Sequence, residues 1–125
     1  MKLGNDPVSE LFPTALETSV LEAFARTLGT AGTTWLAQCR GLRVVGRSHS
    51  GVGFVTRLEV PEDAAALDAE SVGRLLPVHA SHPALREPAE FLVQLRRGRI
   101  IALEAFCFEG NWPDDESGFR LVGLR

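Results

Sequence analysis

One acidic residue, Glu104, interrupts an otherwise apolar stretch at residues 100–108 (Ile-Ile-Ala-Leu-Glu-Ala-Phe-Cys-Phe). Turn-forming residues flank this stretch, around Gly98 before it and around Gly110 after it. A short apolar run between turn signals, rich in β-branched and aromatic residues, predicts a strand buried on both faces. A carboxylate within such a strand must be paired, hydrogen-bonded or protonated, because burying it alone and ionised is strongly unfavourable.

Two roles for Glu104 follow. It could be a general acid or base with a raised pKa in a sheet cavity, with His79 and Arg57 as candidate neighbours. Alternatively, it could form a structural ion pair with Arg57 or Arg74 from another strand, or reach water where the sheet opens. Structural ion pairs also perturb carboxylates, so we favour the structural role.

The pattern of histidines and cysteines predicts neither a metal site nor a cofactor. A metal site needs several converging ligands, usually including a close pair. His79 and His82 are three residues apart, which brings side chains together on a helix but not on a strand, and nearby prolines disfavour a helix. Cys39 and Cys107 have no Cys or His at ligand spacing.

The segment 48–53, Ser-His-Ser-Gly-Val-Gly, is superficially similar to a phosphate-binding loop. It lacks the lysine and the helix start of a P-loop, and no strand–helix crossover follows it. Its two glycines suit a wide hairpin loop or a bulge. His49 in this segment is a candidate for binding a ligand or partner.

Two other segments are candidate binding surfaces. Arg96, Arg97 and Arg99 crowd a predicted hairpin tip, where they could bind an acidic partner or a phosphate, or simply prevent association of sheet edges. Trp112 lies in a loop followed by the acidic residues 114–116, which are typical of a solvated loop. No aromatic residues interleave with the arginines, so we expect no nucleic-acid binding.

Length and composition limit the function classes. A chain of 125 residues is expected to form one domain. Its net charge of −3 gives no general attraction to nucleic acids or anionic membranes. No apolar run approaches the ~20 residues that span a bilayer. The first residues do not resemble a signal region, so we expect a cytoplasmic protein with reduced cysteines.

The N-terminal part predicts helices. Thr14 and Glu17 have the spacing of a capping box, and Gly29 can end the helix, which predicts a helix over 14–28. Apolar residues at spacing four give it one buried face, and they are Leu16, Val20, Phe24 and Leu28. Residues 34–41 fit a short helix or an extended segment, and we favour the helix.

The remainder of the chain predicts strands. Pro77 cannot donate to a ladder, so its strand is expected at an edge. Residues 62–71 form a loop or one helical turn, and the hairpin around Gly98 could have a two-residue turn or a turn with a glycine bulge. The expected strands are 42–47, 54–60, 74–79, 91–95, 99–108 and 119–123.

Together these elements predict an α+β domain over 1–125, in which an N-terminal helix packs on an antiparallel meander sheet of five or six strands. It divides into an extension (1–13), a helical part (14–41) and a sheet (42–125). One helix covers only one face of a sheet. The strand at 100–108 therefore requires either a strongly curled sheet or a second subunit, and we predict a homodimer because two-fold pairing is the commonest assembly.

Four phrases of the sequence resemble a group of small uncharacterised bacterial proteins. They are a "GvGF" strand (47–56), a "GR" hairpin (91–99), an "LE" strand (103–106) and a "WP" loop (112–113). The resemblance implies a small bacterial α+β domain. It implies no established activity, so it assigns no role to any residue.

The sequence therefore predicts a non-enzymatic binding or protein-interaction module, homodimeric, with a small molecule or an acidic protein as a further partner. The alternative is a small-molecule enzyme or ligand-binding protein that uses Glu104 in a sheet cavity.

Overall fold

The structure is a computed structural model that describes residues 11–123. Its helical part comprises α2 (Ala15–Ala23), the 3-10 turns η1 (Phe24–Thr27) and η2 (Gly29–Ala31), and α3 (Gly32–Arg40). A short helix, α4 (Ala69–Val72), and a 3-10 turn, η3 (Glu116–Gly118), lie within later connections. The strands are β1 (Arg43–Ser50), β2 (Gly53–Glu59), β3 (Val78–Ser81), β4 (Ala89–Arg96), β5 (Arg99–Phe106) and β6 (Arg120–Leu121).

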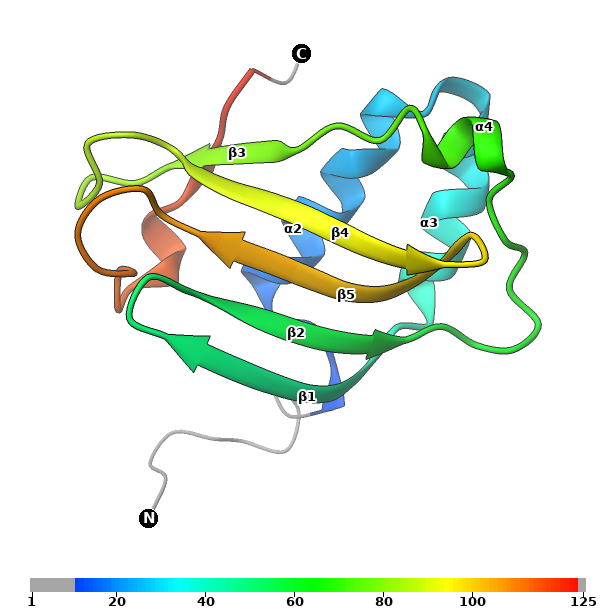
Figure 1. Ribbon diagram of the computed structural model, residues 1–125, viewed down its shortest axis with the longest axis horizontal. Coiled ribbons are helices and arrows are strands. Elements are labelled where there is room, and N and C mark those ends of the chain that lie inside the picture. The colour runs from blue at the N-terminus through cyan, green and yellow to red at the C-terminus, as the bar shows by residue number, and fades with distance from the viewer. Residues whose placement is uncertain (1–10, 124–125) are drawn as a thin grey trace.

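The six strands form one antiparallel sheet in the order β1-β2-β5-β4-β3-β6. Figure 1 shows the five strands from β1 to β3 side by side. The predicted α+β class and the antiparallel sheet are confirmed. The sheet is open, with β1 and β6 at its ends, so it does not curl into a closed barrel. The order of strands differs from that of a simple meander. After β2, the long connection through α4 crosses the positions that β5 and β4 occupy, and β3 therefore lies three positions away from β2 in the sheet.

The helical part confirms the predicted capping box. The Thr14 side chain accepts a hydrogen bond from the Glu17 backbone, and the Glu17 side chain accepts one from the Thr14 backbone. The predicted single helix over 14–28 is instead α2 followed by η1. The Trp35 indole donates to the Leu21 carbonyl in the last turn of α2 at 2.6 Å, so a buried hydrogen bond ties α3 to α2. Gly29 adopts the expected left-handed conformation, with φ of 58°.

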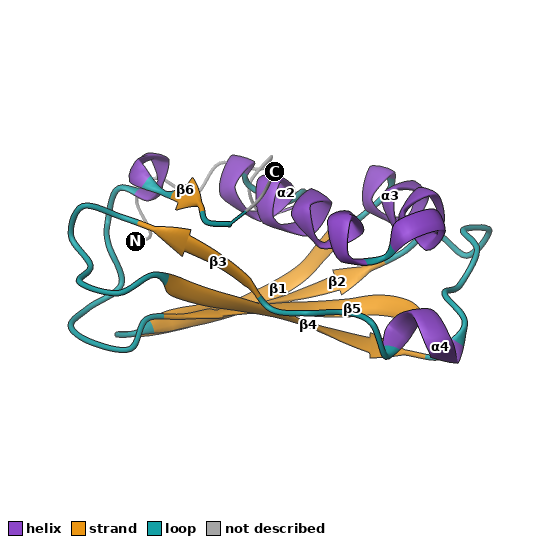
Figure 2. Ribbon diagram, turned by 90° about the horizontal axis from the view of Figure 1, so that it is seen from above, coloured by secondary structure: helices purple, strands orange, loops and turns teal. Residues whose placement is uncertain are grey.

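Helices α2 and α3 lie side by side on one face of the sheet, which we call the inner face (Figure 2). The core forms between these two layers and contains the fully buried Phe24, Trp35, Phe91 and Leu103. The opposite, outer face of the central strands carries no helix in Figure 2. We define it by the residues that alternate with the core positions: Val55, Arg57, Leu92, Ala102, Glu104 and Phe106.

The hairpin between β4 and β5 has a two-residue turn. Arg97 and Gly98 have φ of 52° and 79°, the pattern of a type I′ turn, and Arg96 pairs with Arg99. A register shift follows at Ile101, because Ala102 pairs with Gln94 whereas Ile100 pairs with Leu95. Strict alternation along the strand would place Ile100 on the same face as Glu104, but the bulge turns Ile100 into the core.

Other predicted boundaries also differ, among them the end of the central strand, which lies at Phe106 and not at residue 108. The wide loop predicted for 48–53 is a tight turn, because β1 and β2 extend to Ser50 and Gly53. A Cβ at Gly53 would overlap the Ala105 carbonyl, which explains the glycine. The strand predicted for 74–79 begins only at Val78, after Pro77, and it lies between β4 and β6 instead of at the predicted edge, because Pro77 is outside the paired residues. The last strand is limited to β6.

Candidate functional site

Glu104 lies at the centre of the outer face. It pairs in register with Val55 on β2 and with Leu92 on β4, so apolar side chains flank it on both neighbouring strands. The inner-facing neighbours on its strand, Leu103 and Ala105, are fully buried, whereas Glu104 itself is half-buried. Within one chain, the strand is therefore shielded completely on its inner side and partly on its outer side.

The structure does not bring the predicted partners of Glu104 to it. The guanidinium of Arg57 lies over Gly46 of β1, where a Cβ would overlap it, on the side away from β5. Arg74 pairs with Glu70 within the α4 region at 3.1 Å. His79 on β3 pairs with its cross-strand neighbour Glu90 at 3.0 Å. Over residues 11–123, Glu104 forms no ion pair.

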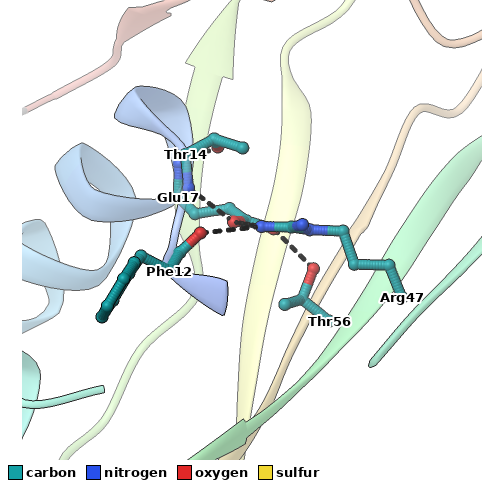
Figure 3. A network of polar contacts seen from close by, with 5 residues as sticks. All are labelled: Phe12, Thr14, Glu17, Arg47 and Thr56. Atoms are coloured by element: carbon teal, nitrogen blue, oxygen red, sulfur yellow. Dashed lines mark hydrogen bonds and ion pairs between the residues drawn. The ribbon is translucent and has the colours of Figure 1, made fainter. Parts of the chain in front are cut away.

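The most deeply buried acid is instead Glu17, whose exposed fraction is 2 %. Arg47 on β1 donates to both of its carboxylate oxygens, Nη2 to Oε1 at 2.6 Å and Nε to Oε2 at 3.1 Å. Thr56 on β2 donates to Oε2 at 2.5 Å, and the Thr14 backbone donates to Oε1 at 2.8 Å. Arg47 Nη2 also contacts the Phe12 carbonyl, as Figure 3 shows.

Burial raises the pKa of Glu17, but the hydrogen bonds from Arg47, Thr56 and Thr14 outweigh it and hold the pKa below its ordinary value. Each carboxylate oxygen of Glu17 accepts from two donors, and the lowered pKa keeps this carboxyl group ionised at neutral pH. This network joins α2 to β1 and β2. With Glu17 enclosed and fully hydrogen-bonded, the arrangement suits a structural tie and leaves no atom of the carboxylate free for chemistry.

Sequence reasoning missed this site, although the signals for it exist. Glu17 precedes Val20 and Leu21 by three and four residues, which places it on the buried face of α2. Thr56 alternates with the core residues Phe54 and Leu58, so its hydroxyl must face the helices. Because Glu17 and Thr56 are polar side chains on two core surfaces that face each other, a hydrogen bond between them is expected.

The arginines of the hairpin tip border a hollow of about 450 Å³. Arg99 donates to the carbonyls of Pro61 and Glu62 at 3.0 and 2.9 Å, so its side chain fixes the connection after β2. Arg96 and Arg97 are exposed at the rim. The hollow is lined by Val45, Leu58, Glu59, Val60, Arg96, Arg97, Arg99, Ile100 and Ile101.

The other two predicted binding residues, Trp112 and His49, contact neighbouring aromatic side chains. Trp112 lies in an aromatic cluster, with its ring centroid 5.4 Å from that of Phe54 and 5.0 Å from that of Phe119, and its indole donates to Glu116 at 2.8 Å. His49 on β1 contacts Phe54, at a centroid distance of 6.2 Å. Neither residue lines the hollow at the hairpin tip.

Residues 11–123 contain neither a candidate metal site nor a candidate membrane-spanning helix. No three His, Cys, Asp or Glu side chains gather there in a way that could hold a metal ion. The helices in this range are too short or too polar to cross a bilayer.

Burial, with a contribution from Glu22, raises the pKa of Cys39 to about 12, so this thiol is protonated at neutral pH.

Comparison with protein-family models, with curated proteins and with solved structures found no match for this chain. The resemblance to small uncharacterised bacterial proteins stays a prediction.

Proposed function

We propose that this chain is a non-enzymatic binding module that pairs with a second copy of itself through the outer face of its sheet. The main support is the one-sided architecture, in which α2 and α3 cover the inner face and no helix covers the centre of the outer face (Figure 2). We place this dimer in the cytoplasm, consistent with two free cysteines.

Apolar side chains on the outer face support this assembly. Val55, Leu92 and Phe106 are half-buried on three adjacent strands. Phe108, just after β5, is 54 % exposed and packs its ring against Phe106 at a centroid distance of 5.3 Å. Apolar side chains gathered around Glu104 on three adjacent strands are typical of a protein interface, because their contact with water is unfavourable.

The charges of the outer face are self-complementary. Arg57 faces Ala102 and Glu104 faces Val55, so the arginine and the acid lie diagonally across β2 and β5. A two-fold axis in the plane of contact, midway between these two residues, would bring each Arg57 opposite the partner's Glu104, and the guanidinium would reach that carboxylate by turning away from Gly46. An isologous interface forms every such contact twice, and each half-buried carboxylate would gain a cation.

The two edges of the sheet are poorly suited to pairing with a second copy of the chain. β6 has only two residues, and β1 carries a bulge at Val45 together with Arg43, Arg47 and His49. Short strands, bulges and charged side chains are the features that prevent edge-to-edge pairing. Face-to-face packing is therefore favoured over extension of the sheet.

Sedimentation velocity at micromolar to hundreds of micromolar concentrations tests the proposal. The wild type should be a dimer, and Leu92→Glu should be a folded monomer because it places a charge at the centre of the interface. Leu76→Glu is the matched control, since Leu76 is 61 % exposed in the connection before β3. A wild type that is monomeric throughout, or a dimeric Leu92→Glu variant, would refute the proposal.

A further inference from the structure

We propose that the hollow at the hairpin tip binds a small amphipathic anion, a carboxylate or phosphate monoester attached to an apolar body. This inference is separate from the dimer, because the hollow lies at the hairpin end of the sheet and Leu92, Phe106 and Phe108 do not line it.

The hollow exists because two strands diverge. β2 and β5 are paired from Gly53 with Phe106 to Arg57 with Ala102, and their pairing stops there. β5 nevertheless stays paired with β4 as far as Arg99. The bulge at Ile101 changes the course of β5 at this point, and the bulge at Val45 does the same for β1. The end of β2 and the start of β5 thus form two walls.

Buried and partly buried polar contacts hold these walls in place. The side chain of Gln38, which is fully buried, donates to the Gly98 carbonyl at 2.9 Å and accepts from the Ile100 backbone at 3.1 Å. Arg99 spans from β5 to the carbonyls after β2. The hollow is therefore built into the fold, as expected for a small-molecule site.

The interior of the hollow is apolar. Val45 is 59 % exposed at its bulge, and Leu58, Val60, Ile100 and Ile101 complete the lining. An apolar ligand body would cover the exposed part of this lining, which Val45 provides together with the partly buried Val60 and Ile101, whereas Leu58 and Ile100 are already buried beneath it. A volume of about 450 Å³ matches the usual size of small-molecule pockets, and no aromatic side chain in the lining offers a stacking surface for a nucleic-acid base.

The rim is positively charged. Arg96 and Arg97 have no ion pair or hydrogen bond from their side chains with another described residue, and Arg99 contacts only neutral carbonyls there. The one acid in the lining, Glu59, lies 4.0 Å from Arg43. Because the whole chain carries a net charge of −3, this concentration of cations is local. Arginine forks bind carboxylates and phosphates in preference to neutral groups.

Calorimetric titration with octanoate and octyl phosphate tests both head groups, with octanol, octylamine and inorganic phosphate as probes that lack one of the two features. We expect saturable binding of at least one octyl anion, about tenfold or more tighter than octanol, octylamine or phosphate. The double variant Arg96→Gln/Arg97→Asn should weaken that binding about tenfold or more, whereas Arg86→Gln should leave it unchanged. Arg86 is the matched control because it is an exposed arginine remote from the hollow, paired with Glu109.

Asn is chosen at position 97 because it tolerates the left-handed backbone of the turn. The proposal is overturned if neither octyl anion binds saturably, if octanol binds as tightly as the anions, or if the double variant binds like the wild type. Sedimentation of the same variants separates this result from the dimer, which the arginine substitutions should leave intact.

Discussion

Arg47 on β1 and Glu17 on α2 form a bidentate ion pair between the sheet and the helical layer, with N–O distances of 2.6 and 3.1 Å. Their side chains are 16 % and 2 % exposed, respectively. Removing one partner of a buried ion pair leaves the other charge buried without a counter-charge. This lowers the free energy of unfolding more than the loss of an exposed ion pair does.

We therefore expect Glu17→Ala to destabilise the fold by about 2–4 kcal/mol. Glu22→Ala, an exposed position on the same helix, is the control and should change stability by less than about 0.5 kcal/mol. The free energies of unfolding come from urea titration followed by circular dichroism. Equal losses for the two variants would show that the network contributes nothing beyond ordinary helix propensity.

The same network predicts acid sensitivity. Since the pKa of Glu17 in the folded state lies below its ordinary value of 4.5, ionised Glu17 stabilises the fold at pH values above 4.5. That contribution is lost as the pH falls through the lower, folded-state pKa. In urea titrations at a series of pH values, Glu17→Gln should flatten the decline of stability in this acidic window. Wild-type and variant curves that run parallel through it would contradict this assignment.

The turn of the β4–β5 hairpin predicts a stabilising substitution. Arg97 occupies a left-handed position, with φ of 52°, that asparagine and glycine adopt more readily. Arg97→Asn should raise stability by about 0.5–1 kcal/mol, whereas Arg97→Val should lower it. Gly98→Ala should be more harmful than Arg97→Val, because a Cβ at Gly98 would overlap the Leu67 carbonyl. Thermal unfolding ranks the three variants, and a stabilised Gly98→Ala would be inconsistent with the type I′ turn.

Cys39 should react slowly with thiol reagents in the native state. A pKa of about 12 in place of 9.0 lowers its thiolate population at neutral pH about a thousandfold. Alkylation of the Cys107→Ser variant by iodoacetamide, followed by mass spectrometry, isolates this thiol. The rate in urea provides the comparison, and similar native and denatured rates would refute the protected environment of Cys39.

Local signals in the sequence were sufficient for many elements of the fold. The capping box of Thr14 and Glu17, the left-handed conformation of Gly29 and the hairpin around Gly98 each depend on residues a few positions apart, and the structure confirms all three, although the α-helix itself ends earlier, at Ala23. The helix favoured over an extended segment for residues 34–41 is present as α3, which spans Gly32–Arg40.

The features that were missed depend on distant contacts. The bulge at Ile101 adjoins the bond between Gln38 and the Ile100 backbone, a contact 62 residues apart in sequence. The ion pair of Glu17 spans 30 residues to Arg47. The position of β5 beside β2 likewise follows from the path of the whole chain. Each of these relationships requires a partner that local periodicity cannot identify, and as a result Glu104 was emphasised while Glu17 was overlooked.

The most direct test of the proposed dimer is a mixing experiment with two charge reversals. Arg57→Glu alone and Glu104→Arg alone each place like charges opposite one another across the two-fold axis, so each variant should sediment as a monomer. An equimolar mixture restores opposite charges at both contacts and should sediment as a dimer. If the two variants separately form dimers as strong as the wild type, or if their mixture stays monomeric, the outer face is not where two copies of this chain meet.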